Sequence, residues 1–175
     1  MRSVLAFFGL APAAAEEGGD TIRRIAAELD RMDPARARYV ASFAYLLSRV
    51  ARADHDVSTD ELHTMERLVA EKGGLPSDQA VLVVQMAKTQ QLLFGGTDDF
   101  LVTREMAGDA SYEQKIALVD CLFAVAAADR RILTAEADEI GRIARELKVD
   151  QADLSRLRSS YRDYIEARKG LGADA

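Results

Sequence analysis

Carboxylate side chains gather in two short stretches of this sequence that match each other at an offset of 75 positions. Residues 50–61 (the first copy) read VARADHDVSTDE, and residues 125–136 (the second copy) read VAAADRRILTAE. Oxygen ligands are those that hard cations such as Ca²⁺ and Mg²⁺ prefer, whereas Zn²⁺ favours histidine and cysteine. The pattern therefore predicts a divalent-cation site, for Ca²⁺ or Mg²⁺ rather than Zn²⁺. Its candidate ligands are Asp54, Asp56, Asp60, Glu61, Asp129 and Glu136.

The two copies differ in charge, and this difference favours the first copy as the cation site. Arg130 and Arg131 follow the aspartate of the second copy and place positive charge where a cation would lie. A purely structural interpretation stays open for both copies, because Asp54 and Asp129 can accept hydrogen bonds from backbone amides and shape the turn. Glu61 can likewise act as a capping residue of the helix that follows.

Other kinds of chemistry find less support in the sequence. Counted from Asp54, Thr59 stands where an EF-hand loop requires glycine, and Met65 stands where it requires a bidentate glutamate. His55 and His63 are the only histidines, and their spacing matches no recognised zinc site. No nucleophile with an adjacent base and no glycine-rich phosphate loop is evident, so we expect a protein that is not an enzyme.

Apolar residues recur at helical spacing along most of the chain, and no window alternates with period two. We therefore predict an all-α protein, a single compact domain of about seven to eight helices. Ser58 with Glu61 and Ser111 with Gln114 have the spacing of capping boxes, and Asp33 before Pro34 marks another helix start. The glycine pairs at 73–74 and 95–96 are expected to end helices, and Gly108 is expected to break one. The expected helices of the domain are about 21–32, 34–53, 59–72, 77–94, 98–107, 112–128, 135–147 and 151–169.

The match between the two copies continues beyond the acidic motif without a gap. It pairs Arg67 with Arg142 and Glu71 with Glu146 at the same offset. A register held over this distance indicates internal duplication within the chain. We therefore predict that the domain consists of two pseudo-symmetric helical halves.

The expected boundaries follow from this duplication and from the glycine-rich segments. The helical domain is predicted at residues 20–169, with its halves at about 35–95 and 98–169. Residues 1–19 are expected to form an apolar segment, with a short docking helix at 4–8, followed by a flexible linker. Residues 170–175 are expected to be a disordered tail.

Composition limits the classes of function. The chain has 175 residues and a formal net charge of −6, which argues against nucleic-acid binding because phosphate contacts need a basic surface. Cys121 is the only cysteine and lies in an apolar run, so we expect a buried thiol and no intrachain disulfide. No stretch approaches the roughly 20 apolar residues that a membrane span needs. We expect a cytoplasmic protein, with a cleaved N-terminal signal as the alternative.

The paired A-x-A-D-x-x-[VI]-x-T-x-E turns, each between two apolar helices, resemble those of the TerB-like superfamily. This superfamily includes the tellurite-resistance TerB proteins and the N-terminal region of the DjlA co-chaperones. The resemblance covers about residues 35–169 and is closest to stand-alone TerB-like proteins of bacteria. It departs from the usual Asp-Gly of the turn, because Asp54 precedes His55 and Asp129 precedes Arg130.

The resemblance implies an all-helical, pseudo-symmetric fold and a role as an interaction or scaffolding module in stress response. It also implies a link to divalent cations through Asp54, Glu61, Asp129 and Glu136. We accordingly expect a non-enzymatic module that binds an unidentified protein partner and a divalent cation. Peripheral membrane association and a homodimer stay open. The alternatives are a metal-independent helical adaptor and, with less support, a metal-dependent hydrolase or lyase.

Overall fold

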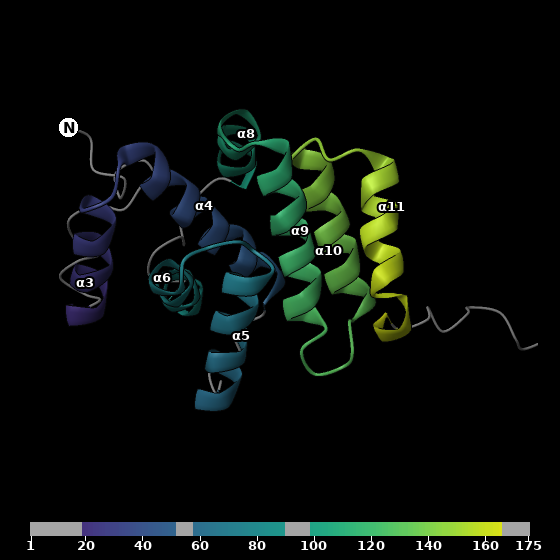
Figure 1. The fold of residues 1–175 in the computed structure, drawn as a ribbon, viewed down its shortest axis with the longest axis horizontal. Helices are drawn as coiled ribbons and strands as arrows, with labels where there is room; N and C mark the ends of the chain where they lie inside the picture. Colours follow the sequence, from purple (N-terminus) through teal and green to yellow (C-terminus); the bar gives the residue numbers. More distant parts are fainter. Residues whose placement is uncertain (1–18, 52–57, 90–98, 166–175) are drawn as a thin grey trace, which may run out of the picture.

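The computed structural model describes residues 19–51, 58–89 and 99–165 (Figure 1). Within these ranges the chain forms eight α-helices and one short 3₁₀ helix, and it contains no strand. The all-α prediction is therefore confirmed. The helices are α3 (Gly19–Asp30), α4 (Pro34–Val50), α5 (Thr59–Glu71), α6 (Ser77–Lys88), α8 (Asp99–Asp109), α9 (Tyr112–Ala126), α10 (Thr134–Glu146) and α11 (Gln151–Ser160), followed by η1 (Arg162–Tyr164).

Helix α4 is the centre of the fold. It packs against α3, α6, α8, α9 and α10, and almost every residue from Ala37 to Val50 is buried. Small and apolar residues occur on every side of this helix. A helix that is apolar on all sides is typically surrounded by other helices.

Helix α9 is the second buried helix and leads into the second copy. Figure 1 shows α9, α10 and α11 side by side, and α9 also packs against α4 and α5. Cys121 lies on this helix with none of its surface exposed, which confirms the predicted buried thiol. Burial raises the pKa of the Cys121 thiol to about 12, so it remains protonated at neutral pH.

The helix starts that the sequence marks most clearly are present. Asp33 caps α4, and its carboxylate accepts hydrogen bonds from the amides of Ala35 and Arg36. Ser58 and Ser111 each form a complete capping box, as predicted, at the starts of α5 and α9. These caps satisfy backbone amides that have no partner within the helix.

Helix α5 ends where the sequence predicts, at a pair of glycines. A Cβ at Gly73 would lie 2.5 Å from the carbonyl oxygen of Val69 and 2.7 Å from Cζ of Phe43, so only glycine fits there. Gly74 has a φ of +69°, a left-handed conformation that glycine adopts without steric cost. These two residues let the chain turn closely against α4.

Several predicted helix boundaries are wrong. Helix α8 continues through Gly108 to Asp109, because an exposed glycine costs only about 1 kcal/mol within a helix. Helix α10 begins at Thr134 rather than Ala135, with Leu133 in the capping position. Helix α4 ends at Val50, since Ala51 already has an extended backbone with φ −73° and ψ 91°.

The last helix is also shorter than predicted, because it ends at Ser160 instead of residue 169. The Tyr161 ring stacks on Phe123 at 5.5 Å, and its hydroxyl donates to Oδ1 of Asp120 at 2.7 Å. The chain then turns through η1, and the amide of Ile132 donates to the carbonyl of Tyr164 at 2.7 Å. This contact brings the end of the described chain against the second copy.

Some predictions concern residues outside the described ranges. They are the docking helix at 4–8 with its linker, the tail at 170–175 and the turn of the first copy at 52–57. The helix predicted at 77–94 is wrong at its end, because α6 ends at Lys88 with Thr89 as its C-cap.

Candidate functional site

The described part of the first copy begins at Ser58, at the start of α5. The Ser58 amide donates to Oε2 of Glu61 at 2.7 Å, and the Glu61 amide donates to the Ser58 hydroxyl at 3.2 Å. The hydrogen bond from the Ser58 backbone, and then that from its side chain, hold the pKa of the Glu61 carboxyl below its usual range. Asp60 is exposed in the same helical turn, whereas Asp54 and Asp56 lie outside the described residues.

The second copy is described completely, and its aspartate shapes the turn. Helix α9 ends at Ala126, and the Arg130 amide donates to the carbonyl of Ala127 at 2.8 Å. Oδ1 of Asp129 accepts a hydrogen bond from the Arg131 amide at 3.2 Å. An aspartate that accepts from the amide two residues ahead stabilises a turn, which is the structural role considered for Asp129.

Arg130 stands where the resemblance to TerB-like proteins places glycine. Its φ is +65°, in the left-handed region that glycine adopts without strain and other residues adopt at a cost of roughly 1–2 kcal/mol. The backbone of the second copy therefore has the left-handed conformation that glycine favours, although arginine stands there. The hydrogen bond made by Asp129 helps to hold it.

The glutamate of the second copy caps α10. Oε2 of Glu136 accepts a hydrogen bond from the Leu133 amide at 2.8 Å. Leu133 offers no side-chain oxygen in return, so only half of the capping box is present, whereas Ser58 and Glu61 form both halves at the first copy. Both candidate ligands of the second copy thus already accept backbone hydrogen bonds.

A divalent cation needs several oxygen ligands gathered in one place. Within residues 19–51, 58–89 and 99–165, no three His, Cys, Asp or Glu side chains gather in a group that could hold a metal ion. At the second copy, two carboxylates engaged with backbone amides stand beside exposed Arg130 and Arg131, which is a poor fit to a cation. A cation site at the first copy stays a prediction.

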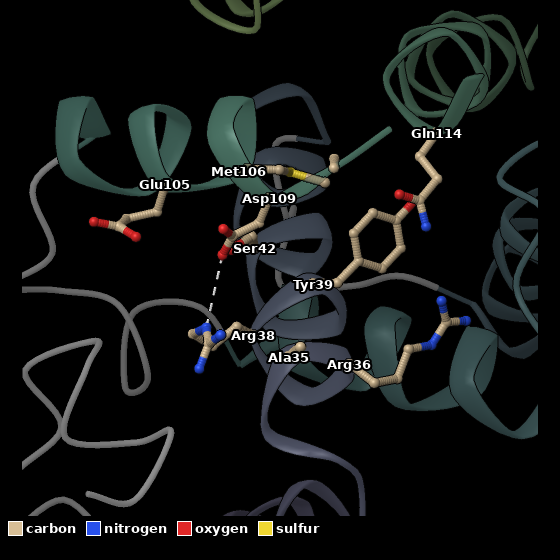
Figure 2. A pocket seen from close by; sticks show the side chains of 10 residues that line it. Ala35, Arg36, Arg38, Tyr39, Ser42, Glu105, Met106, Asp109 and Gln114 are labelled. Atoms are coloured by element: carbon tan, nitrogen blue, oxygen red, sulfur yellow. Dashed lines mark ion pairs between the residues drawn. The ribbon is translucent and has the colours of Figure 1, made fainter. Parts of the chain in front are cut away.

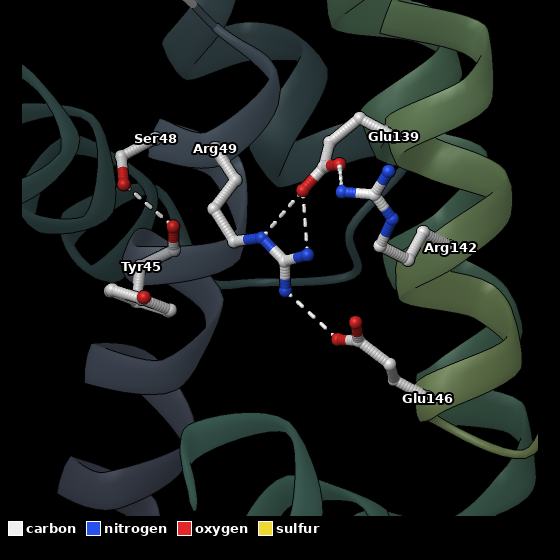
Figure 3. A network of polar contacts seen from close by, with 6 residues as sticks. All are labelled: Tyr45, Ser48, Arg49, Glu139, Arg142 and Glu146. Atoms are coloured by element: carbon white, nitrogen blue, oxygen red, sulfur yellow. Dashed lines mark hydrogen bonds and ion pairs between the residues drawn. The ribbon is translucent and has the colours of Figure 1, made fainter. Parts of the chain in front are cut away.

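Arg49 lies directly before the first copy and is not one of the residues of the motif. The Arg49 guanidinium on α4 contacts two carboxylates of α10 (Figure 3). Its Nη2 lies 2.6 Å from Oε1 of Glu139, and its Nη1 lies 2.9 Å from Oε2 of Glu146. Arg142 pairs with the other oxygen of Glu139 at 2.9 Å. Four charged groups therefore form one network between the two helices.

Burial makes this network different from a surface ion pair. The Arg49 side chain is only 8% exposed, against 21% for Glu139 and 27% for Glu146. Desolvation lowers the pKa of Arg49, but its hydrogen bonds to Glu146 and Glu139 outweigh that effect and raise the pKa above its ordinary value. Arg49 thus stays charged and joins the helix that ends at the first copy to the helix that begins at the second.

The sequence does contain a signal for this network. Arg49 is the charged residue in the otherwise uncharged stretch from residue 39 to residue 51. Arginine is almost never fully buried unless it is paired. A buried stretch of a central helix that holds a single arginine therefore requires carboxylate partners, although the spacing cannot say on which helix they lie.

One family of known proteins matches this chain. The family model described as tellurite resistance protein TerB matches residues 39–159. The chain belongs to the TerB family. The matched region of TerB similarity contains both copies of the motif and the whole Arg49 network, whereas α3 lies outside it. Searches of curated proteins and of solved structures found no match.

The TerB assignment confirms the resemblance on which the sequence analysis relied. It supports a TerB-like module. Among the described helices, none combines the length and apolarity that crossing a membrane requires.

Proposed function

We propose that this TerB-family protein is a non-enzymatic interaction module that acts in the cytoplasm as part of a stress-response system. In this proposal, helix α5 contacts a protein partner, and a Ca²⁺ or Mg²⁺ ion bound at the first copy adjusts that contact. The cation ligands would come from Asp54, Asp56, Asp60 and Glu61. The observation that carries the proposal is the partly uncovered apolar face of α5.

Three large apolar side chains of α5 remain partly exposed. Leu62, Met65 and Leu68 recur at helical spacing and pack against the core without being fully covered. Val69 is the one residue of α5 that is fully buried. Apolar surface left at helical spacing is the kind of surface that partner proteins cover, because its burial is favourable.

The Arg49 network supports a mechanism that links the cation to this face. A cation at the first copy would join the end of α4 to the start of α5. Because Arg49 ties the end of α4 to α10, the expected adjustment falls on α5 rather than on α4. The angle of α5, and with it the presentation of Leu62, Met65 and Leu68, would then depend on the cation.

The cation is tested by thermal unfolding of chelator-stripped protein in the presence of Ca²⁺, Mg²⁺, Mn²⁺ or Zn²⁺. A ligand that binds only the folded state raises the unfolding midpoint once its concentration exceeds its Kd. We expect Ca²⁺ or Mg²⁺ to raise the midpoint of the natural protein and of Asp129→Ala, but not that of Asp54→Ala. No rise at millimolar ion, or a rise lost only in Asp129→Ala, would contradict the cation site.

The partner surface is tested by a photo-crosslinking amino acid placed at Met65 in cells that make the protein. The matched control carries the same amino acid at Arg67, an exposed position on the same helix. We expect a discrete crosslinked product from position 65 and none from position 67. Equal products from both positions, or none from either, would contradict a partner surface on α5.

A metal-independent adaptor is the second candidate. The second copy favours it, because Asp129 and Glu136 act there on backbone amides. Crosslinking at position 65 that is unchanged by chelator, together with an unfolding midpoint unaffected by any cation, would establish this alternative.

A further inference from the structure

A cavity of about 210 Å³ lies away from both copies of the motif. The N-terminal half of α4, the C-terminal half of α8 and the first turn of α9 enclose it (Figure 2). Pockets for drug-sized ligands measure roughly 300–1,000 Å³, so this cavity suits a smaller molecule. It contains both polar groups and opposite charges.

The floor of the cavity offers a buried hydroxyl. Ser42 on α4 is only 3% exposed, and its hydroxyl has no hydrogen-bond partner within the described part of the chain. Ser48, on the same helix, shows the usual alternative, because its hydroxyl donates to the carbonyl of Tyr45 at 2.6 Å. The described residues contain no fully buried side-chain oxygen or nitrogen that lacks a partner, so the Ser42 hydroxyl remains reachable from the cavity.

Two further polar groups lie on one wall. The Tyr39 ring is held edge-on against Phe43 at 6.2 Å and lies under the Arg36 guanidinium at 5.2 Å. Burial raises the pKa of the Tyr39 hydroxyl to about 12, so it is a neutral donor and acceptor. Gln114 uses Oε1 to accept from the Ser111 amide, which leaves its NH₂ group for a ligand. Figure 2 shows Tyr39 and Gln114 on the same side of the cavity.

Opposite charges face each other at the mouth. Arg38 projects from α4 toward Asp109 on α8, with Nε and Oδ2 3.8 Å apart, and Glu105 lies one helical turn before Asp109 (Figure 2). The Arg38 and Asp109 side chains are 38% and 59% exposed. A long and solvated ion pair contributes little to stability, so a ligand can replace it at little cost.

We propose that this cavity binds a small zwitterion of the free amino-acid class with a polar side chain. The ligand carboxylate would pair with Arg38, and its ammonium group would pair with Asp109 and Glu105. Its side chain would point inward to the Ser42 hydroxyl. The long ion pair between Arg38 and Asp109 is then replaced by two ion pairs, one for each charge of the ligand. A molecule with a single charge can form only one of them.

The test is a titration with L-serine and L-glutamine, followed by amide chemical shifts in NMR spectra of the full chain. Ethanolamine and 3-hydroxypropanoate are the matched analogues, because each lacks one of the two charged groups of serine. Chelator is present throughout, so the result is independent of the cation proposed for the first copy. We expect shifts at residues 35–42 and 105–114 with at least one amino acid, and binding at least about tenfold weaker for both analogues.

Variants connect the binding to the named side chains. Arg38→Gln should weaken binding by about tenfold or more, and Ser42→Ala should weaken it with little change in the unfolding midpoint, because the hydroxyl that is removed has no partner. Arg67→Gln, an exposed change on α5, is the control and should bind like the natural protein. No shift with either amino acid, equal binding of one analogue, or unchanged binding by Arg38→Gln would overturn the proposal.

Discussion

Helices α5 and α10 occupy the same place in the repeated sequence, yet they are buried differently. Both begin with threonine and end with glutamate, and their bounds differ by 75 positions at each end. Leu62, Met65 and Leu68 on α5 are partly exposed. The residues at the same offset on α10 are Ala137, Ile140 and Ile143, and none of them has any exposed surface.

The neighbours of each helix explain this difference. Helix α10 packs against α4, α8, α9 and α11, whereas α5 packs mainly against α6 and α9. The ion pairs of Arg49 with Glu139 and Glu146 add polar contacts to the packing of α4 against α10 (Figure 3). The duplicated sequence therefore repeats the position of a helix but not its surroundings. One helix is part of the core, and the other has a partly exposed apolar face.

Truncation of one side chain at matched positions of the two helices should give the largest difference in stability. Ile140→Ala should lower the free energy of unfolding by about 2–5 kcal/mol, because it removes a fully buried side chain. Met65→Ala should cost about 1 kcal/mol or less, since Met65 keeps solvent contact. Urea denaturation of both variants measures the difference. Equal losses would mean that α5 is as well buried as α10.

Removal of the Arg49 side-chain charge tests the bond between the two halves. Arg49→Met should lower the free energy of unfolding by about 1–3 kcal/mol, because two partly buried carboxylates lose their hydrogen-bonded partner. Arg67→Met, on the exposed side of α5, is the matched control and should change stability by about 0.5 kcal/mol or less. Denaturant unfolding gives both values. If Arg49→Met left the free energy of unfolding unchanged, the network would not stabilise the fold.

A glycine at the second turn tests its backbone strain. Arg130→Gly should raise the free energy of unfolding by about 0.5–1 kcal/mol, because Arg130 has a φ of +65°. Lys148→Gly, at a φ of +61° outside the motif, serves as a comparison. A clear loss of stability in Arg130→Gly, measured by thermal unfolding, would mean that the arginine side chain itself supports the turn.

The smallest effect concerns acid stability at the first copy. The pKa of Glu61 is lowered by its cap, so its contribution is fully present above the unfolded-state pKa of about 4.3 and is lost as the pH falls through the folded-state pKa. Glu61→Gln should therefore reduce the loss of stability on acidification below about pH 4.3. Unfolding midpoints measured across this range, with Glu66→Gln as a control outside the cap, test it. If Glu61→Gln left the pH dependence of the unfolding midpoint unchanged, the Glu61 cap would make no contribution to acid stability.

Local signals in the sequence were sufficient for most of the fold. Capping residues at Asp33, Ser58 and Ser111 and the glycine pair at 73–74 predicted helix ends correctly, because caps and glycines act on backbone within a few residues of themselves. The prediction at Gly108 was wrong because one exposed glycine is too weak to end a helix. The end of α11 was wrong because tertiary contacts of Tyr161 and Tyr164 decide it.

The candidate site was predictable only in part. The roles of Asp129 and Glu136 as backbone acceptors follow from their place beside turns and helix starts. The partners of Arg49 lie 90 and 97 positions away, and the cavity joins α4 with α8 and α9. Contacts over such distances depend on how helices pack, which periodicity within one helix does not specify.

Hydrogen exchange measured by mass spectrometry compares the two copies in one experiment. Amides of residues 59–71 and 134–146 are followed in chelator and then in millimolar Ca²⁺ or Mg²⁺. The account predicts faster exchange in α5 than in α10 in chelator, since α10 is covered on more sides, and slower exchange in α5 alone when the cation is added. Equal protection of the two helices in chelator, or a cation effect confined to α10, would contradict the division of roles between the copies.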